Sequence, residues 1–211
     1  GALATIAVKE VDEVQHFGVV VSDEQGRILR FQEKPRPEEA LSNLANTGIY
    51  IFEPEIFKLI PKNEFYDFGK QLFPYLVKIA APFYGVSIGE YWCDVGNIKT
   101  YRQANADVIC GQVKVPYTGE LWSVDKQSSL LLGEGASLGR DVAIKGQVVI
   151  GPGCKIGAGA RIENSVIWND TVVGQNTIIK DSVIGSVCMI GESVYVSPDS
   201  VIASGSYLQN K

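Results

Sequence analysis

The sequence predicts two regions of different architecture, an α/β region followed by a left-handed parallel β-helix of hexapeptide repeats. Aromatic residues are frequent up to about residue 130, whereas the rest of the chain contains only Trp168, Tyr195 and Tyr207. That same part of the chain carries an aliphatic residue at nearly every sixth position. We therefore expect an α/β domain over residues 1–110, a linker over 111–130 and the β-helix over 131–211.

Short β-branched runs alternate with helix-like segments in the first 110 residues. Strands are expected at ATIAV (4–8), GVVVS (18–22), ILRFQ (28–32), NTGIYIF (46–52) and FYGVSI (83–88). Apolar spacing predicts helices at 54–60, at 69–80 with Pro74 inside, and at 97–110. Strands that alternate with helices are typical of an α/β domain. In the linker we expect a little extended structure around KVPY (114–117).

The hexapeptide repeat appears when the chain is aligned in sixes: LGEGAS, LGRDVA, IKGQVV, IGPGCK, IGAGAR and IENSVI, from Leu132 to Ile167. Six residues form a short strand and a turn, three such faces make one triangular coil, and about four coils are expected to stack. Each unit opens with an aliphatic residue or, in one case, with Trp168. This opening residue should fill the interior of the triangular coil. The residue four places later is small or β-branched, as Cys154 and Ala160 are, and should fit near a corner.

Two irregularities of the repeat carry further expectations. The register slips by one residue after 168 and again after 179, which predicts shortened turns. Glycines recur at the turns, and we expect them to supply backbone conformations open to a residue without a Cβ; they are Gly151, Gly157, Gly174, Gly185 and Gly191.

A β-helix of this kind is not itself an activity. Acyltransferases and metal-dependent hydratases use such coils, but both usually need histidines that project from them. The only histidine of the chain is His16, in the other region, where its neighbours indicate a surface loop. The β-helix is therefore expected to be a structural, assembly or regulatory module.

Composition and charge limit the partners. The formal net charge of −5 argues against nucleic acid or an anionic membrane as the main partner. No apolar run approaches the ~18–20 residues of a transmembrane helix. The cysteines lack zinc-type pairs such as CxxC and are interpreted as buried small side chains in a reducing compartment; they are Cys93, Cys110, Cys154 and Cys188. A cytoplasmic protein is expected.

The stretch FQEKP (31–35) ends a predicted strand on an acid and a base, and the proline then prevents central strand pairing. Because neighbours in a strand face opposite sides, Glu33 and Lys34 need not pair, and both charges could simply be solvated. The alternative is a functional pair of residues.

The motifs favour that alternative. FGVVV, GRILRFQEKP, NTGIYIF, YDFGKQLFP and EYWCDVGNIKTYRQA, in this order and followed by hexapeptide coils, resemble the sugar-1-phosphate nucleotidyltransferases. The resemblance is closest to the mannose-1-phosphate guanylyltransferase group, with the glucose-1-phosphate enzymes next. It covers residues 4 to about 205 and implies a partial Rossmann-like nucleotidyltransferase domain before the β-helix.

The resemblance implies roles for particular residues. Lys34 matches the catalytic lysine that neutralises the sugar phosphate, and Glu33 matches the carboxylate that accepts hydrogen bonds from sugar hydroxyls. Gly18 resembles the glycine whose backbone approaches the sugar, although it could be only a turn glycine. Asn46 and Thr47 match sugar-contacting positions, although Asn46 could instead bond backbone at the strand end.

Asp94, in YWCDVG, resembles a carboxylate that holds Mg²⁺, the cofactor that the family implies. Taken alone, this aspartate is better interpreted as a cap of the helix that begins near Asn97, and it is the resemblance to the family that favours the metal role. Tyr91 and Trp92 are interpreted as packing residues rather than as sugar-stacking ones.

The family's glycine-rich signature, roughly GGxGTRLxPLT, does not occur in these 211 residues. The chain is therefore expected to be the C-terminal part of such an enzyme and not to form nucleotide sugar by itself. The expected substrates of the parent are a sugar 1-phosphate and a nucleoside triphosphate, and a homodimer is the expected form. A non-catalytic regulatory or assembly subunit of the same architecture is the alternative.

Overall fold

The computed structural model describes residues 1–210, which form two compact units, one at Gly1–Trp92 and one that starts at Cys93. The sequence-based boundary lay at residue 110, whereas in the structure the helix α2 (Ile98–Ile109) belongs to the second unit. Each unit is described separately. No helix within residues 1–210 combines the length and the apolar character that crossing a membrane requires.

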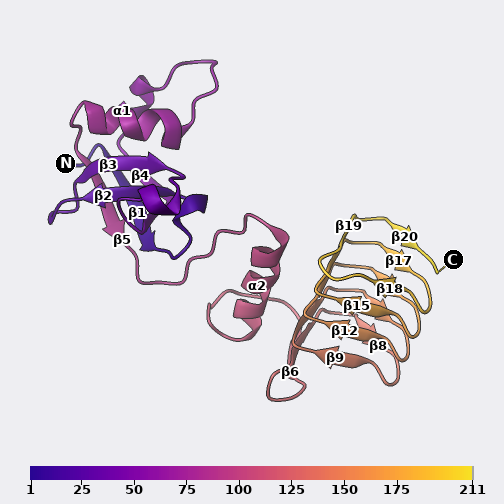
Figure 1. The fold of residues 1–211 in the computed structure, drawn as a ribbon. Helices are drawn as coiled ribbons and strands as arrows, with labels where there is room; N and C mark the ends of the chain where they lie inside the picture. The colour runs from indigo at the N-terminus through magenta and orange to yellow at the C-terminus, as the bar shows by residue number, and fades with distance from the viewer. Residues whose placement is uncertain (211) are drawn as a thin grey trace. The chain divides into compact units, whose positions relative to one another are not determined.

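The first unit is built on one five-stranded sheet (Figure 1). Its strands lie in the order β3-β2-β4-β1-β5, and they span β1 Ala4–Glu10, β2 Gly18–Ser22, β3 Ile28–Glu33, β4 Leu44–Phe52 and β5 Phe83–Ser87. β1 and β5 are parallel, and the remaining neighbours are antiparallel. All five predicted strands are thus present, and the mixed α/β character is confirmed.

Short helical segments complete this unit. Two single 3₁₀ turns lie at η1 Val14–His16 and η2 Pro37–Glu39, and the predicted helix at 54–60 is a 3₁₀ helix, η3 Pro54–Leu59. The predicted helix at 69–80 is a π turn, η4 Phe68–Leu72, followed by α1 Phe73–Lys78. Pro74 lies in the first turn of α1, directly after η4.

The core of the first unit lies between one face of the sheet and these two helices. Alternation in β1 buries Ala4, Ile6 and Val8, as expected for a strand with one face against a core. Phe73 is fully buried at the centre, with ring centroids 5.1 Å from Phe31 and 5.2 Å from a second strand phenylalanine, Phe83. Residues that share the core face of the sheet are therefore held under η4 and α1.

The second unit is a left-handed parallel β-helix with α2 against one of its three sheets (Figure 1). The sheet under α2 has the order β19-β16-β13-β10-β7-β6, with β6 Glu120–Ser123, β7 Ser129–Leu132, β10 Gln147–Ile150, β13 Val166–Ile167, β16 Val183–Ile184 and β19 Val201–Ile202. The second contains β8 Ser137–Leu138, β11 Lys155–Ile156, β14 Val172–Val173, β17 Met189–Ile190 and β20 Tyr207–Leu208. The third contains β9 Ala143–Lys145, β12 Arg161–Glu163, β15 Ile178–Lys180 and β18 Tyr195–Val196.

The stretch predicted as a linker contributes to the first of these sheets. β6 pairs antiparallel with β7, so the sheet begins at Glu120 rather than at residue 131. Residues 114–117, where extended structure was expected, form no strand.

The first register slip lies earlier than predicted. Ile167 is fully buried in the coil interior, whereas Trp168 is 43% exposed, so Trp168 does not fill the interior and that part of the prediction was wrong. The interior residues Ile162 and Ile167 are five positions apart because the turn at Asn164 is short. The second slip is confirmed, since Ile179 and Ile184 enclose an equally short turn at Asp181.

The recurrent glycines serve a different purpose from the one predicted. Gly151 and Gly157 do not have left-handed backbone angles; that conformation belongs to other turn residues, such as Gly153 and Asp170. A Cβ at Gly157 would instead lie 2.6 Å from the backbone nitrogen of Gln175 in the next coil. These glycines permit adjacent coils to approach closely, and any side chain would push the coils apart.

Buried hydroxyl groups join successive coils at the corners. Thr171 Oγ1 donates a hydrogen bond to the carbonyl oxygen of Gly185 at 2.8 Å and accepts one from the backbone N–H of Cys188 at 3.1 Å. Thr177 makes the equivalent pair of bonds to Gly191 and Val194. Each threonine thus satisfies a backbone donor and a backbone acceptor that the solenoid buries.

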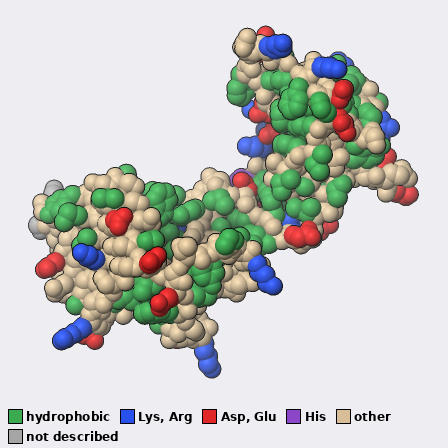
Figure 2. Space-filling model, turned by 180° about the vertical axis from the view of Figure 1, so that it is seen from behind, with side chains coloured by type: hydrophobic (Ala, Val, Ile, Leu, Met, Phe, Trp, Pro, Cys, Tyr) green, Lys and Arg blue, Asp and Glu red, His purple; other side chains and the backbone are tan. Residues whose placement is uncertain are grey.

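Charged side chains fix α2 to the solenoid. Arg102 of α2 is only 15% exposed and forms ion pairs with Asp181 at 2.9 Å and Asp199 at 2.8 Å, from two successive coils. On the face in Figure 2, acidic and basic side chains lie singly among hydrophobic and uncharged ones, without a broad field of one sign.

Candidate functional site

The end of β3 brings Glu33 next to Gly18. The two residues are direct partners in the antiparallel β2–β3 pair. Strand alternation puts Glu33 on the same face as Phe31, which is the face covered by η4 and α1. The carboxylate is therefore half-buried, and the solvated interpretation of this charge does not describe Glu33.

Two glycines from different elements flank this carboxylate. A Cβ on Gly18 would lie 2.9 Å from Oε2 of Glu33, and a Cβ on Gly69 of η4 would lie 2.5 Å from the same oxygen. A side chain at position 69 would require the carboxylate to move, and a side chain at position 18 would also require the ring of Phe31 to move, because its Cζ would lie 2.6 Å from the Cβ. Gly18 is buried within β2, so it is a strand residue and not a turn glycine.

The electrostatic surroundings of Glu33 are mixed. Burial raises the pKa of the Glu33 carboxyl above its usual value, Asp67 raises it further, and Lys34 and Lys70 oppose the change. Asp67 itself is fixed at the start of η4, where its Oδ1 accepts a hydrogen bond from the backbone N–H of Lys70 at 2.9 Å. A second carboxylate is thus held near the first one.

Asn46 and Tyr50 form the neighbouring part of the site. Asn46 Nδ2 donates to the Tyr50 hydroxyl at 3.0 Å, and its Oδ1 accepts from the backbone N–H of Gly48 at 3.1 Å. Gly48 has φ +80, a conformation favoured by glycine, and this irregularity of β4 allows the two side chains to meet. Burial raises the pKa of Tyr50, the hydrogen bond from Asn46 lowers it, and Glu33 and Asp67 raise it. The hydroxyl thus lies within the field of both carboxylates.

Lys34 ends the strand in an unusual backbone conformation. Its φ of +47 lies in the left-handed region, which is uncommon for a residue other than glycine, while its N–H donates to the carbonyl oxygen of Phe17 at 3.1 Å. The chain changes direction here, and Lys34 is exposed while the adjacent Glu33 is half-buried. An exposed ammonium beside a half-buried carboxylate is suited to a ligand that carries both hydroxyl and phosphate groups.

Thr47 has a different environment from the other predicted residues. It is buried, and its hydroxyl donates to the carbonyl oxygen of Ala7 in β1 at 2.8 Å. The indole N–H of Trp92 donates to the Thr47 carbonyl oxygen at 3.1 Å, and the Trp92 ring lies 5.5 Å from that of Phe17. These contacts confirm a packing role for Trp92. His16 is exposed, as predicted, and lies 3.5 Å from Glu13.

Asp94 lies in the second compact unit, in the exposed segment before α2. It does not cap this helix, because Asn97 does: Asn97 Oδ1 accepts from the N–H of Thr100 at 2.9 Å, and Thr100 Oγ1 accepts from the N–H of Asn97 at 3.2 Å. Within residues 1–210 no three acidic, histidine or cysteine side chains form a metal cluster.

The cysteines agree only partly with the interpretation as buried side chains. All four are free; Cys154 and Cys188 are buried in the solenoid, whereas Cys93 is partly buried and Cys110 is exposed.

Three residues of this site were not assigned a role from the sequence: Tyr50, Asp67 and Gly69. The available signal was the YDFGK stretch at 66–70, which served only as one of the motifs of the resemblance. We use the term Glu33 site for Gly18, Glu33, Lys34, Asn46, Tyr50, Asp67 and Gly69.

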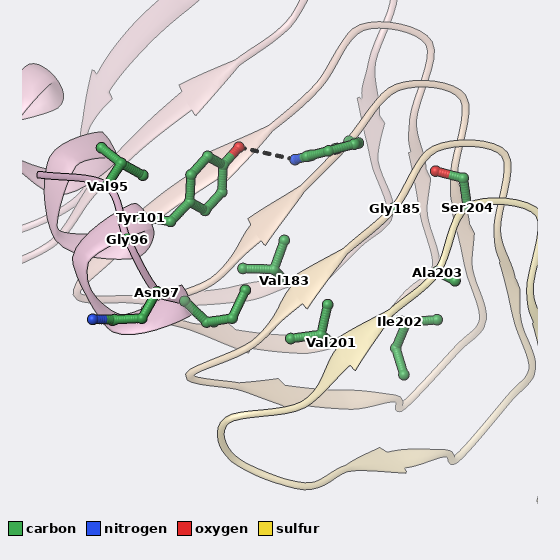
Figure 3. A pocket seen from close by; sticks show the side chains of 12 residues that line it. Val95, Gly96, Asn97, Tyr101, Val183, Gly185, Val201, Ile202, Ala203 and Ser204 are labelled. Atoms are coloured by element: carbon green, nitrogen blue, oxygen red, sulfur yellow. Dashed lines mark hydrogen bonds between the residues drawn. The ribbon is translucent and has the colours of Figure 1, made fainter. Parts of the chain in front are cut away.

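A separate hollow of about 400 Å³ lies in the second unit, beside the start of α2 (Figure 3). Tyr101 from the helix and the strand residues Val183 and Val201 border it, and Tyr101 accepts a hydrogen bond from the indole of Trp168 at 3.0 Å. Its lining is mainly apolar. None of the sequence-predicted site residues borders it.

Comparison with known families agrees with both units. The Nucleotidyl transferase family matches residues 1–110, and the EIF2B subunit epsilon LbH domain matches residues 120–211. The chain belongs to the nucleotidyl transferase family. The match confirms the resemblance to sugar-1-phosphate nucleotidyltransferases and the order of a nucleotidyltransferase domain and a left-handed β-helix.

Individual relatives in this family carry specific names. A UTP–glucose-1-phosphate uridylyltransferase of Synechocystis sp. is 41% identical over 192 residues, which covers 82% of this chain and 50% of the relative. Glucose-1-phosphate adenylyltransferases of Acetivibrio thermocellus and Desulfitobacterium hafniense are 31% and 33% identical, covering 99% and 98% of this chain and 52% and 58% of their own lengths. The chain thus spans about half the length of these nucleotidyltransferases.

Proposed function

We propose that the protein to which this chain belongs transfers a nucleotidyl group from a nucleoside triphosphate to a sugar 1-phosphate, and that the Glu33 site binds the sugar phosphate. The supporting observation is the half-buried carboxylate of Glu33, flanked by Gly18 and Gly69 and followed directly by the exposed Lys34. Half-burial of an acid costs free energy unless partners compensate it, which favours a ligand role over a stabilising one.

The reaction needs little covalent chemistry from the protein. An oxygen of the sugar phosphate attacks the α-phosphorus of the triphosphate, the bond from that phosphorus to the oxygen bridging to the β-phosphate breaks, and pyrophosphate leaves with that oxygen. In this proposal Lys34 neutralises the charge of the sugar phosphate, and the half-buried Glu33 accepts hydrogen bonds from sugar hydroxyls. The contribution of both residues is orientation and charge compensation, which can account for a large part of a rate enhancement.

Asn46 and Thr47 have different parts in the proposal. Asn46 carries a side-chain amide, oriented by Tyr50, that can reach a sugar hydroxyl. Thr47 has an indirect role in the proposal: its hydroxyl fixes the backbone of β4 to β1, and this holds the neighbouring Asn46 in place. Asp94 is proposed as one carboxylate ligand of Mg²⁺, which supplies charge neutralisation at the phosphates when bound.

Glucose 1-phosphate is the proposed sugar substrate, because relatives that cover most of this chain are named for it. Mannose 1-phosphate, which the sequence motifs favoured, differs at one hydroxyl and is the competing sugar. A site that hydrogen-bonds a particular hydroxyl can discriminate strongly against a sugar that presents it differently.

Titration of both sugar phosphates into the chain, with kinetics of the full-length protein, tests the proposal. Lys34→Ala should lower kcat/KM by at least about 10²-fold, the effect of removing one preorganised donor. Lys34→Arg should restore little, because a planar guanidinium does not reproduce a compact ammonium. Lys62→Ala, at an exposed lysine of the same unit, is the control. Near-wild-type turnover of Lys34→Ala would refute the proposal.

A regulatory or assembly subunit is the second candidate, and the match of residues 120–211 to the EIF2B subunit epsilon LbH domain favours it. One measurement, the effect of Lys34→Ala, distinguishes the two candidate functions. A regulatory subunit would bind its partner protein with no change in Lys34→Ala, whereas the enzyme would lose sugar-phosphate turnover.

We also propose a homodimer to which the solenoid contributes, located in the cytoplasm. An exposed apolar row on one sheet supports the dimer: Val172, Met189 and Tyr207 are consecutive cross-strand partners. Four free cysteines are consistent with a reducing compartment.

A further inference from the structure

Gly69 occupies a position where backbone conformation does not require glycine. It is the second residue of η4, and its φ is outside the left-handed region, unlike that of Gly48 in the same unit. Alanine is favoured over glycine at helical positions by roughly 0.5–1 kcal/mol. Local structure alone would therefore predict alanine here, and the reason for glycine must lie in what surrounds it.

The surroundings contain one decisive neighbour. The nearest atom to a Cβ on Gly69 is Oε2 of Glu33 at 2.5 Å, followed by the carboxyl carbon at 3.1 Å and Oδ1 of Asp67 at 3.4 Å. On the opposite strand Gly18 limits the same oxygen, since a Cβ there would be 2.9 Å from it. The carboxylate thus lies in a slot whose two sides are glycines from β2 and η4.

The slot is rigid on the Gly69 side. The Oδ1 of Asp67 accepts from the Lys70 N–H at 2.9 Å, and the Asp67 N–H donates to Oε1 of Gln71 at 2.7 Å, so hydrogen bonds enclose Gly69 from both directions. Phe68, the residue before Gly69, packs on Tyr50 at 5.9 Å and on Phe52 at 5.6 Å. An added methyl group would therefore displace the carboxylate rather than the turn.

We propose that Gly69 is a positioning residue: it holds the Glu33 carboxylate in the orientation that receives the sugar hydroxyls, and any side chain at 69 moves that carboxylate out of the slot. The inference rests on the proposed sugar-phosphate function of the same site. It assigns a steric role to Gly69, and no contact of Gly69 with the substrate is needed.

The first test needs no substrate. Carbon-detected NMR of the Glu33 carboxyl in the 211-residue chain follows its titration in wild type, in Gly69→Ala and in the control Gly89→Ala, where an added Cβ meets no atom within 4 Å. Asp67, Lys34, Lys70 and Tyr50 are the titratable neighbours and are unchanged in both variants. In Gly69→Ala the pKa of Glu33 should fall toward its ordinary value as the carboxylate moves into solvent, while thermal stability stays the same or rises. An unchanged titration in Gly69→Ala would overturn the proposal.

The second test measures the function and a rescue. Gly69→Ala should weaken glucose 1-phosphate binding to the chain by at least about tenfold, and Gly89→Ala should not. Glu33→Asp has a shorter side chain, which relieves the clash, so it should cost less affinity in the Gly69→Ala background than in wild type. Additive effects of the two substitutions would contradict the positioning role. If the wild-type chain binds no sugar phosphate, the proposed function fails, and the NMR titration alone decides the role of Gly69.

Discussion

At the scale of single residues, the most informative feature is an acid that the fold half-buries and that forms no ion pair within residues 1–210. Glu33 faces the core side of the sheet because it lies two positions from Phe31 on the same strand. Burial raises its pKa, and the nearby lysines compensate only in part. A group of this kind lowers the stability of the free protein, which agrees with the ligand role that we propose for it.

The stability of the protein should depend on pH through this residue. Because the folded-state pKa of Glu33 is raised, the folded chain binds more protons than the unfolded chain between the ordinary pKa and the raised one. The free energy of unfolding should therefore fall as the pH rises through this window, and in Glu33→Gln the fall should be smaller. Chemical denaturation at a series of pH values measures it, with Glu64→Gln, at an exposed glutamate of the same unit, as the control. A pH dependence identical in wild type and Glu33→Gln would contradict the assignment.

Some residues of the site could be predicted from the sequence and others could not, and the difference lies in how far apart in the sequence the contacting residues are. Glu33 and Lys34 could be proposed because they sit side by side in one motif, and Asn46 follows in the next strand. Gly69 could not, because its importance arises from contact with an oxygen of a residue 36 positions earlier in the chain. Steric contacts across such separations depend on the packing of η4 on the sheet, which periodicity does not specify.

At the scale of elements, the hexapeptide pattern predicts the solenoid but not the position of every turn. Ile167 and Trp168 are both apolar and adjacent, so the pattern fits either one as the interior residue. The structure selects Ile167 because the short turn at Asn164 advances the coil by one position. Ile178 and Ile179 are adjacent apolar residues as well, but there Ile179, the residue that opens the predicted unit, is the buried one, so the predicted slip is correct.

The buried threonines of the solenoid should be needed for their hydroxyl groups rather than for their size. Thr171→Val keeps the shape but leaves the N–H of Cys188 and the carbonyl of Gly185 without the threonine hydroxyl. A buried polar group left without a partner costs about 1–3 kcal/mol, so the solenoid should be destabilised by about 2 kcal/mol. Thermal unfolding monitored in the second unit measures this effect.

Thr118→Val is the matched control, because Thr118 is exposed in the same unit. Equal stability of the two variants would mean that the coils do not depend on these hydroxyl contacts.

At the scale of the whole molecule, the exposed apolar surface of the solenoid supports the dimer that we propose. Val172, Met189 and Tyr207 face outward on consecutive strands of one sheet, and Val187 is exposed at the turn that leads into β17. Val187 also has φ +57, a conformation in which a β-branched residue is an outlier. Exposed methionine and tyrosine are typical of the centre of an interface.

A two-fold dimer through this row would bring Met189 against its own copy, so one substitution introduces two charges at the centre of the contact. Met189→Glu should therefore convert the proposed dimer to a monomer, because burying like charges opposite each other is strongly unfavourable. Multi-angle light scattering at concentrations in the tens of micromolar range measures the mass. Lys155→Glu, which changes an exposed residue one strand further along the same sheet, should leave the dimer intact. A wild-type chain that is strictly monomeric, or a Met189→Glu variant that remains a dimer, would show that this row is not the contact.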